Sequence, residues 1–269
     1  MLSRRQIVAG GLAAAVAMPS IVRAAPITNQ VTKRLVVIGD SYSDPNYDTT
    51  NTSAVIPNWA EILVSRGRAA SMANYALSGA TALDYANAPA RGTFKKQLDL
   101  FLANPRYGDD DITVVYMGYN DIARSTDVRW TNLMQSKADF RVGVDRLLTA
   151  GAARDKRRLL IVAVHDWSRK PNSRAEYLPR TREWLTFTYD FVNKRRATHK
   201  GMICVNVFRR FNDVVLRPQS YGLNNVTTAD PARAATTALY YNTSHFGAKG
   251  QTILANEFSS AFDLVCRTR

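Results

Sequence analysis

Five short, continuous apolar runs recur along the chain, and each ends at small or polar residues. The runs are rich in valine, isoleucine and leucine. Runs of this length and composition are typical of strands that are covered on both faces of a sheet. The predicted strands are residues 35–38, 72–77, 112–117, 159–164 and 202–207.

Between these runs, apolar residues return every three or four positions, which predicts helices with one buried face. The expected helices run from Trp59 to Gly67, over 94–102, through Phe140 and Val144, through Trp184 and Phe187, over 211–216 and over 247–265. Strands that alternate with helices in this way indicate right-handed crossovers and a parallel sheet. We therefore expect an α/β fold: a three-layer α/β/α, flavodoxin-like, five-stranded parallel sheet with helices on both faces.

The first 25 residues differ from the rest of the chain. Arg4 and Arg5 precede an apolar run rich in alanine and glycine, and residues 22–24 have the small-x-small pattern of a cleavage site. Residues 3–8 resemble a bacterial twin-arginine signal, which exports folded proteins. We expect residues 1–24 to be a cleavable twin-arginine-type signal peptide, and residues 25–269 to be a single domain that is periplasmic or secreted. An anchoring N-terminal helix is the alternative, although the run is short for a membrane span.

The chain is basic, with 36 Lys and Arg against 22 Asp and Glu and a formal net charge of +14. Removal of residues 1–24 takes away three arginines and no acid, which leaves about +11. Such a charge favours transient contact with an anionic membrane surface or with anionic glycans. The basic residues are scattered and form no aromatic-interleaved tract, so we expect no nucleic-acid partner.

Cysteine usage leaves one question open and gives no sign of a metal site. Cys204 and Cys266 permit a disulfide outside the cytoplasm, whereas the apolar run around Cys204 favours a buried thiol. No Cys/His cluster has metal-ligand spacing. We therefore expect no metal site. The sequence does not decide the oligomeric state.

The polar residues that follow the predicted strands are candidates for chemistry. Ser41 follows the first strand, Gly79 the second and Asn120 the third. In a parallel sheet these ends share one edge, where open α/β folds bind their ligands. Acyl transfer by serine requires a nucleophile, a base and donors to the oxyanion. Ser41 is the candidate nucleophile, and its own N–H, the Gly79 N–H and the Asn120 side chain are candidate donors. The polar stretch 44–57 is expected to form a loop over this edge.

Each of these positions also has an ordinary structural interpretation. Residues 39–41 suit a capped strand-to-helix turn, Gly79 suits a turn, and Asn120 suits a helix cap. Two histidines are equally placed to act as the base: His165 at a strand end and His245 in a turn before the last helix. The third histidine lies near a helix end between polar residues, and we expect it to be exposed.

Four sequence blocks resemble those of one family. They are Gly39-Asp40-Ser41 with Ser43 and Asp44, residues 74–80, residues 118–121 and the stretch that ends at His245. Over about residues 36–258 the chain resembles the SGNH or GDSL hydrolases, and within them the lipase, lecithinase and haemolysin-like esterase branch. The resemblance implies Ser41 as nucleophile and His245 as base. It also implies an oxyanion hole formed by Ser41, Gly79 and Asn120.

One position departs from the family pattern. The family has an aspartate three residues before the histidine, and this chain has Asn242. An asparagine carbonyl can accept the imidazole N–H, but it has no charge to stabilise an imidazolium. In the serine-protease triad the Asp-to-Asn change lowers kcat about 10⁴-fold. Three possibilities follow: a Ser41–His245 dyad helped by Asn242, recruitment of another acid such as Asp166, or a catalytically weak protein. The dyad is preferred because every other catalytic position is present.

The expected function is that of an exported serine esterase or lipase that hydrolyses carboxylic esters without a cofactor. Six residues beside the site are candidates to line the substrate, and the aromatic ones suit either an apolar acyl pocket or the core: Tyr42, Tyr119, His165, Asp166, Trp167 and Tyr241. With the basic surface, a phospholipid or another acyl lipid is the first expected substrate, and an acetylated glycan is the second. An acyltransferase and a non-catalytic binding protein are the rival functions.

Overall fold

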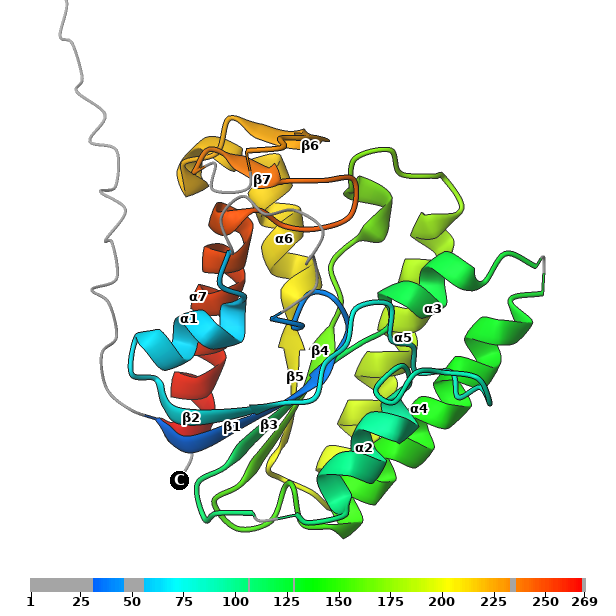
Figure 1. Cartoon of the computed structure of the whole chain (residues 1–269), viewed down its shortest axis with the longest axis vertical. Coiled ribbons are helices and arrows are strands. Elements are labelled where there is room, and N and C mark those ends of the chain that lie inside the picture. Colours follow the sequence, from blue (N-terminus) through cyan, green and yellow to red (C-terminus); the bar gives the residue numbers. More distant parts are fainter. Residues whose placement is uncertain (1–30, 46–55, 106, 128, 233–235, 268–269) are drawn as a thin grey trace, which may run out of the picture.

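The chain folds around a five-stranded parallel sheet (Figure 1). The computed structural model describes residues 31–45, 56–105, 107–127, 129–232 and 236–267. The strands of this sheet are β1 (Thr32–Gly39), β2 (Ala69–Asn74), β3 (Ile112–Tyr116), β4 (Arg158–Ala163) and β5 (Met202–Asn206). Their order, β2-β1-β3-β4-β5, is the flavodoxin-like order, as predicted.

Helices cover both faces of the sheet, which gives three layers (Figure 1). One layer contains α1 (Trp59–Ser65), α6 (Val207–Leu216) and α7 (Ala248–Arg267). The other contains α2 (Phe94–Leu102), α4 (Thr131–Thr149) and α5 (Tyr177–Arg196), with the short α3 (Tyr119–Arg124) packed against α4 and α5. Aromatic pairs join helices within each layer. Trp59 stacks on Phe258 with ring centroids 4.0 Å apart, and Phe94 packs on Phe140 at 5.3 Å.

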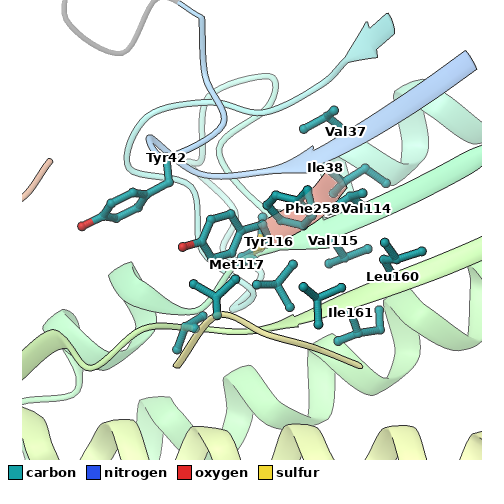
Figure 2. Packing of buried hydrophobic residues seen from close by; sticks show 14 of the residues in the cluster. Val37, Ile38, Tyr42, Val114, Val115, Tyr116, Met117, Leu160, Ile161 and Phe258 are labelled. Atoms are coloured by element: carbon teal, nitrogen blue, oxygen red, sulfur yellow. The ribbon is translucent and has the colours of Figure 1, made fainter. Parts of the chain in front are cut away.

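The central strands are apolar because helices exclude water from both faces. Every residue of β3 and of β4 is buried. Figure 2 shows aliphatic side chains of the central strands packed together, with the rings of Tyr42 and Tyr116 at one side of them. The hydroxyl groups of both rings point away from the aliphatic side chains (Figure 2). This boundary between the apolar core and the polar edge is where the candidate site lies.

Most predicted elements agree with the structure, and α2 has the predicted bounds. The predicted strand 72–77 is shifted, since β2 begins at Ala69 and ends at Asn74. The sequence analysis did not predict α3 or the two-stranded parallel sheet of β6 (Asn225–Ala229) and β7 (Ala238–Tyr240). Helix α3 is only six residues long and β6 is polar, so neither shows a clear apolar periodicity in the sequence.

Several other predictions can be placed on the structure. The predicted signal peptide, residues 1–24, and residues 46–55 of the expected loop lie outside the described residues. No disulfide joins Cys204 to Cys266, and burial raises the pKa of the Cys204 thiol to about 12. Among the helices of the described residues, none has the length and apolar character needed to cross a bilayer. Within the same part of the chain, no group of His, Cys, Asp or Glu side chains is arranged to hold a metal ion.

Candidate active site

The turn after β1 presents Ser41 at the carboxyl end of the sheet. The N–H groups of Ser43 and Asp44 donate to the Asp40 carbonyl at 3.0 and 3.1 Å, so the chain reverses as soon as the strand ends. The strand end requires glycine, because a Cβ on Gly39 would lie 2.7 Å from a backbone carbonyl oxygen of β3. Ser41 itself is 7% exposed. The turn therefore holds the serine at the boundary of the core with little contact to solvent.

Three amide side chains from other elements hold this turn. Gln97 of α2 is fully buried; its Oε1 accepts the Gly39 N–H at 2.9 Å, and its Nε2 donates to the Gly39 carbonyl at 2.8 Å. Asn58 and Asn74 donate to the Ser43 carbonyl at 3.0 and 2.7 Å. Gln97 was not among the predicted site residues. A polar amide on the buried face of the predicted helix 94–102 was the signal that could have identified it.

The turn itself carries a buried carboxyl group, that of Asp40, and the buried carboxyl group of Asp121 is its neighbour. Asp40 accepts the Tyr42 N–H at 3.1 Å through Oδ1, while its Oδ2 has no hydrogen-bond partner among the described residues. Burial raises the pKa of Asp40 to about 8, and the neighbouring Asp121 adds to the rise. Burial also raises the pKa of Asp121, although the N–H groups of Ala82 and Leu83 donate to it. At neutral pH the carboxyl group next to Ser41 is therefore mostly protonated.

The two other predicted oxyanion donors lie side by side. Asn120 donates from Nδ2 to the carbonyl of Ala80 at 2.8 Å, so its amide sits against the residue that follows Gly79. Gly79 has a φ of 78°, which favours glycine. The same loop is tied to the turn after β1, because Asp44 accepts the Ser78 N–H at 2.7 Å. A carboxamide carries two N–H donors, and the bond to Ala80 uses one of them.

His245 lies in a tight turn between β7 and α7. The Tyr241 N–H donates to the His245 carbonyl at 3.1 Å and closes the turn. Inside it, Asn242 Oδ1 accepts the backbone N–H groups of Ser244 and His245 at 2.8 and 2.7 Å. The histidine side chain is half-buried. Asn242 therefore builds the turn that carries the histidine.

The same asparagine amide faces the His245 ring. Nδ1 of His245 lies 3.0 Å from Asn242 Nδ2 and 3.2 Å from Asn242 Oδ1. With a proton on Nδ1 the ring donates to Oδ1, and Nε2 keeps the lone pair that a base needs. With the proton on Nε2, Asn242 Nδ2 donates to Nδ1, and Nε2 can no longer accept a proton. Asparagine thus permits two tautomers where an aspartate, which has no donor when ionised, would favour only the first.

Tyr42 connects the two turns. Its ring centroid lies 5.8 Å from that of His245, and its hydroxyl donates to the Ser244 carbonyl. Phe246, which follows the histidine, packs against the same tyrosine ring at 5.1 Å. The residue after Ser41 and the residues on both sides of His245 are therefore in direct contact.

The histidine alternative, His165, is a core residue. It is 1% exposed, and its ring packs against Tyr119 at 4.5 Å and Phe246 at 4.7 Å. Burial lowers the pKa of His165 to about 3, so the ring stays neutral at physiological pH. A histidine that resists protonation this strongly is a poor base for a serine. His199, the third histidine, precedes β5 and so lies at the amino ends of the strands, on the opposite side of the sheet from the site.

The predicted aromatic lining residues are buried. Tyr42 and Tyr119 are each 1% exposed, and Trp167 and Tyr241 are also buried. Tyr119 packs against Tyr42 with ring centroids 4.6 Å apart and against Trp167 at 5.1 Å. The sequence could not separate these two interpretations, because a strand end next to a site has the same composition as a strand end in a core.

Asp166, the alternative acid, has a local structural role. Its Oδ1 accepts the backbone N–H of Ser168 at 2.9 Å, which caps the 3₁₀ helix η1 (Trp167–Arg169). Its Oδ2 lies 3.4 Å from Arg169 Nε. The side chain that the structure places against Nδ1 of His245 is that of Asn242.

Solved structures share this fold. An acetylxylan esterase from Geobacillus stearothermophilus, in a catalytic mutant form, matches with a TM-score of 0.54 and 15% identity over 88% of this chain and 96% of that one. An α/β hydrolase from the metagenome of Lake Arreo, Spain, has a TM-score of 0.52 and 20% identity, with 87% and 96% covered. The acetyl xylan esterase AlAXEase has a TM-score of 0.55 and 12% identity, with 85% and 98% covered.

A sequence comparison assigns the family. A search of curated proteins found no match. The profile of the GDSL-like Lipase/Acylhydrolase family matches residues 35–258, which include all the site residues described above. The match confirms the resemblance seen in the four sequence blocks. The chain therefore belongs to the GDSL-like lipase/acylhydrolase family and is a carboxylic ester hydrolase.

Proposed function

We propose that the chain is an exported serine esterase in which Ser41 is the nucleophile and His245 the base. Ser41 Oγ bonds to the ester carbonyl carbon while its proton passes to Nε2 of His245. Collapse of the tetrahedral intermediate expels the alcohol, which takes that proton. Water then loses a proton to His245 and attacks the acyl-enzyme, which releases the acid and restores the serine.

One observation carries this proposal: Tyr42 joins the turn that bears Ser41 to the turn that bears His245, whose Nδ1 faces Asn242. The oxyanion that forms during attack needs donors that are already in place. The Ser41 N–H, the Gly79 N–H and the second N–H of the Asn120 amide supply them in this proposal. The contact between Asn120 and Ala80 supports it, because it fixes the amide beside Gly79.

For the substrate, we infer an ester with a short acyl group, such as an O-acetyl group on a glycan. The burial of Tyr42, Tyr119, Trp167 and Tyr241 supports this choice, because these rings fill the core behind the site. The fold is shared with enzymes that are described as acetylxylan esterases. The rival substrate is a phospholipid or another acyl lipid at an anionic surface, which the net charge of about +11 without residues 1–24 supports.

Export is proposed from the sequence around Arg4 and Arg5, which has the features of a twin-arginine signal. Replacing both arginines with lysine should retain the precursor in the cytoplasm. Unchanged export of that double variant would contradict this part of the proposal.

The test of the esterase is hydrolysis of p-nitrophenyl esters across a series of acyl lengths. Ser41→Ala should abolish the rate, while Ser65→Ala, an exposed serine in α1, should leave it unchanged. Activity confined to acetate and butyrate supports the short-acyl substrate, and a maximum at long chains supports the lipid. Equal rates in the wild type and Ser41→Ala would refute the proposed enzyme. Product analysis with a competing alcohol separates a hydrolase from an acyltransferase.

A further inference from the structure

We propose that Tyr42 is a positioning residue for His245. It supplies part of the support that, in the family pattern, comes from an aspartate at the position of Asn242. The inference rests on the proposed function of His245. It concerns a residue for which the sequence allowed either a substrate-lining or a core position, and which is 1% exposed in the structure.

The hydroxyl of Tyr42 donates to the carbonyl of Ser244, the peptide group that leads directly into His245. This bond joins two residues that are 202 positions apart in the sequence. The ring of Tyr42 adds contacts to His245 at 5.8 Å and to Phe246 at 5.1 Å. The hydroxyl therefore fixes the backbone of the histidine turn from the side of the sheet.

A chain of buried hydrogen bonds orients that hydroxyl. Since Tyr42 donates to Ser244, its oxygen accepts from Nε2 of His165, 3.3 Å away. Nδ1 of His165 must then accept; its nearer partner is the Tyr119 hydroxyl, and the Tyr116 hydroxyl lies 3.4 Å away. Tyr119 in turn accepts from the hydroxyl of Tyr116 at 2.8 Å and from the backbone N–H of His165 at 2.7 Å.

Each side chain in this series of hydrogen bonds donates in the direction of Ser244. A single set of proton positions therefore satisfies all of the bonds. The direction requires His165 to be neutral with its proton on Nε2. The low pKa of His165 agrees, because burial prevents a second proton at physiological pH. A neutral, oriented network of this kind fixes geometry without introducing a charge.

The His245 turn needs a second support because Asn242 holds the ring less strictly than an aspartate would. Asn242 Oδ1 already accepts two backbone N–H groups, and its amide tolerates both tautomers of His245. Tyr42 cannot choose the tautomer. It holds the turn in place, so that the ring stays in reach of the serine whichever nitrogen carries the proton.

The test compares two matched variants, Tyr42→Phe and Tyr116→Phe. Both remove one buried hydroxyl from the same network, but only Tyr42 contacts Ser244. Tyr42→Phe should lower kcat about 10- to 100-fold at unchanged KM, since small displacements of a catalytic group have effects of that size. Tyr116→Phe should change kcat less than threefold. A kcat within twofold of wild type for Tyr42→Phe, or equal losses in both variants, would overturn the inference.

A second pair of variants leaves Tyr42 in place and covers the case in which Tyr42→Phe does not fold. The glutamine in His165→Gln can donate to Tyr42, whereas the leucine in His165→Leu cannot. We expect His165→Gln to retain more kcat than His165→Leu at similar unfolding midpoints. The reverse order would also overturn the inference. An inactive wild type would instead refute the proposed function, so the two failures are distinguishable.

Discussion

The two turns that carry the candidate catalytic residues are supported in different ways. The turn after β1 is held by neighbouring strands and by three buried or half-buried amide side chains, and Ser41 is almost fully buried. The turn before α7 is half-buried, and one asparagine and one tyrosine hydroxyl provide much of its support. The proposed nucleophile is therefore fixed by the sheet itself, whereas the proposed base depends on a few neutral contacts.

Substitutions that weaken the two turns should therefore have different effects on folding and on kcat. Substitutions of the three amide side chains that hold the first turn should damage folding together with activity. Substitutions at the second should change kcat and leave the fold intact.

The largest effect is expected from His245→Ala. Loss of the base should lower kcat about 10⁴-fold or more, by analogy with other serine hydrolases. The unfolding midpoint should change little, because the side chain is half-buried and the turn is built by Asn242. Single-turnover hydrolysis of p-nitrophenyl acetate and thermal unfolding measure the two quantities. The matched control is His199→Ala, at the opposite edge of the sheet, which should keep the wild-type rate.

A smaller loss is expected when an oxyanion donor is removed. Asn120→Ala should lower kcat about 10²- to 10³-fold, which is the usual cost of losing one such donor. KM should stay near the wild-type value, because the donor acts on the charge that develops during attack. A rise in KM with kcat unchanged would place Asn120 in ground-state binding instead.

Asn242→Asp tests the weaker support of the base directly. An ionised carboxylate accepts the Nδ1 proton and cannot donate, so it favours the productive tautomer and stabilises the imidazolium. We expect kcat to rise about tenfold or more. Asn242→Ala, which removes the amide from the turn, should lower it. Loss of activity in Asn242→Asp would mean that the asparagine amide has a positive role.

The two turns also differ in their response to pH, because the first contains a buried carboxyl group with a raised pKa. Asp40 has a pKa of about 8 in the folded chain and about 3.8 when unfolded. Between these values the folded state keeps a proton that the unfolded state releases, so stability falls as pH rises from about 4 to 8. One such group changes the free energy of unfolding by up to about 1.4 kcal/mol per pH unit. Asp40→Asn should flatten this slope in urea unfolding series, and an unchanged slope would contradict the burial argument.

The sequence predicts the first turn better than the second, and the reason is the range of the contacts. Residues 39–41 follow an apolar run directly, so a strand end and a tight turn can be read locally. Helix α2 is equally local, because Thr93 caps it by accepting the Lys96 N–H at 3.2 Å. The bond between Gln97 and Gly39 spans 58 residues, and that between Tyr42 and Ser244 spans 202. A local pattern can mark Gln97 as a buried polar residue, but no local pattern identifies the distant partner in either bond.

The positions of the aromatic residues could not be predicted from local sequence either. A tyrosine at a strand end suits both a pocket wall and a core, and only the packed structure shows that Tyr42 and Tyr119 are buried. His165 and His245 were equal candidates by position for the same reason. The burial of His165 separates them, because it lowers the pKa of that ring to about 3.

Covalent labelling tests the central claim, that Ser41 is a nucleophile activated by His245, most directly. The chain is incubated with a fluorophosphonate, and the intact mass is measured over time. We expect one phosphonyl group to be added to the wild type, at Ser41 by peptide mapping, with no addition to Ser41→Ala and at least a hundredfold slower addition to His245→Ala, since base catalysis contributes about 10²- to 10⁴-fold. Equal labelling of Ser41→Ala and the wild type, or labelling that is independent of His245, would contradict the account.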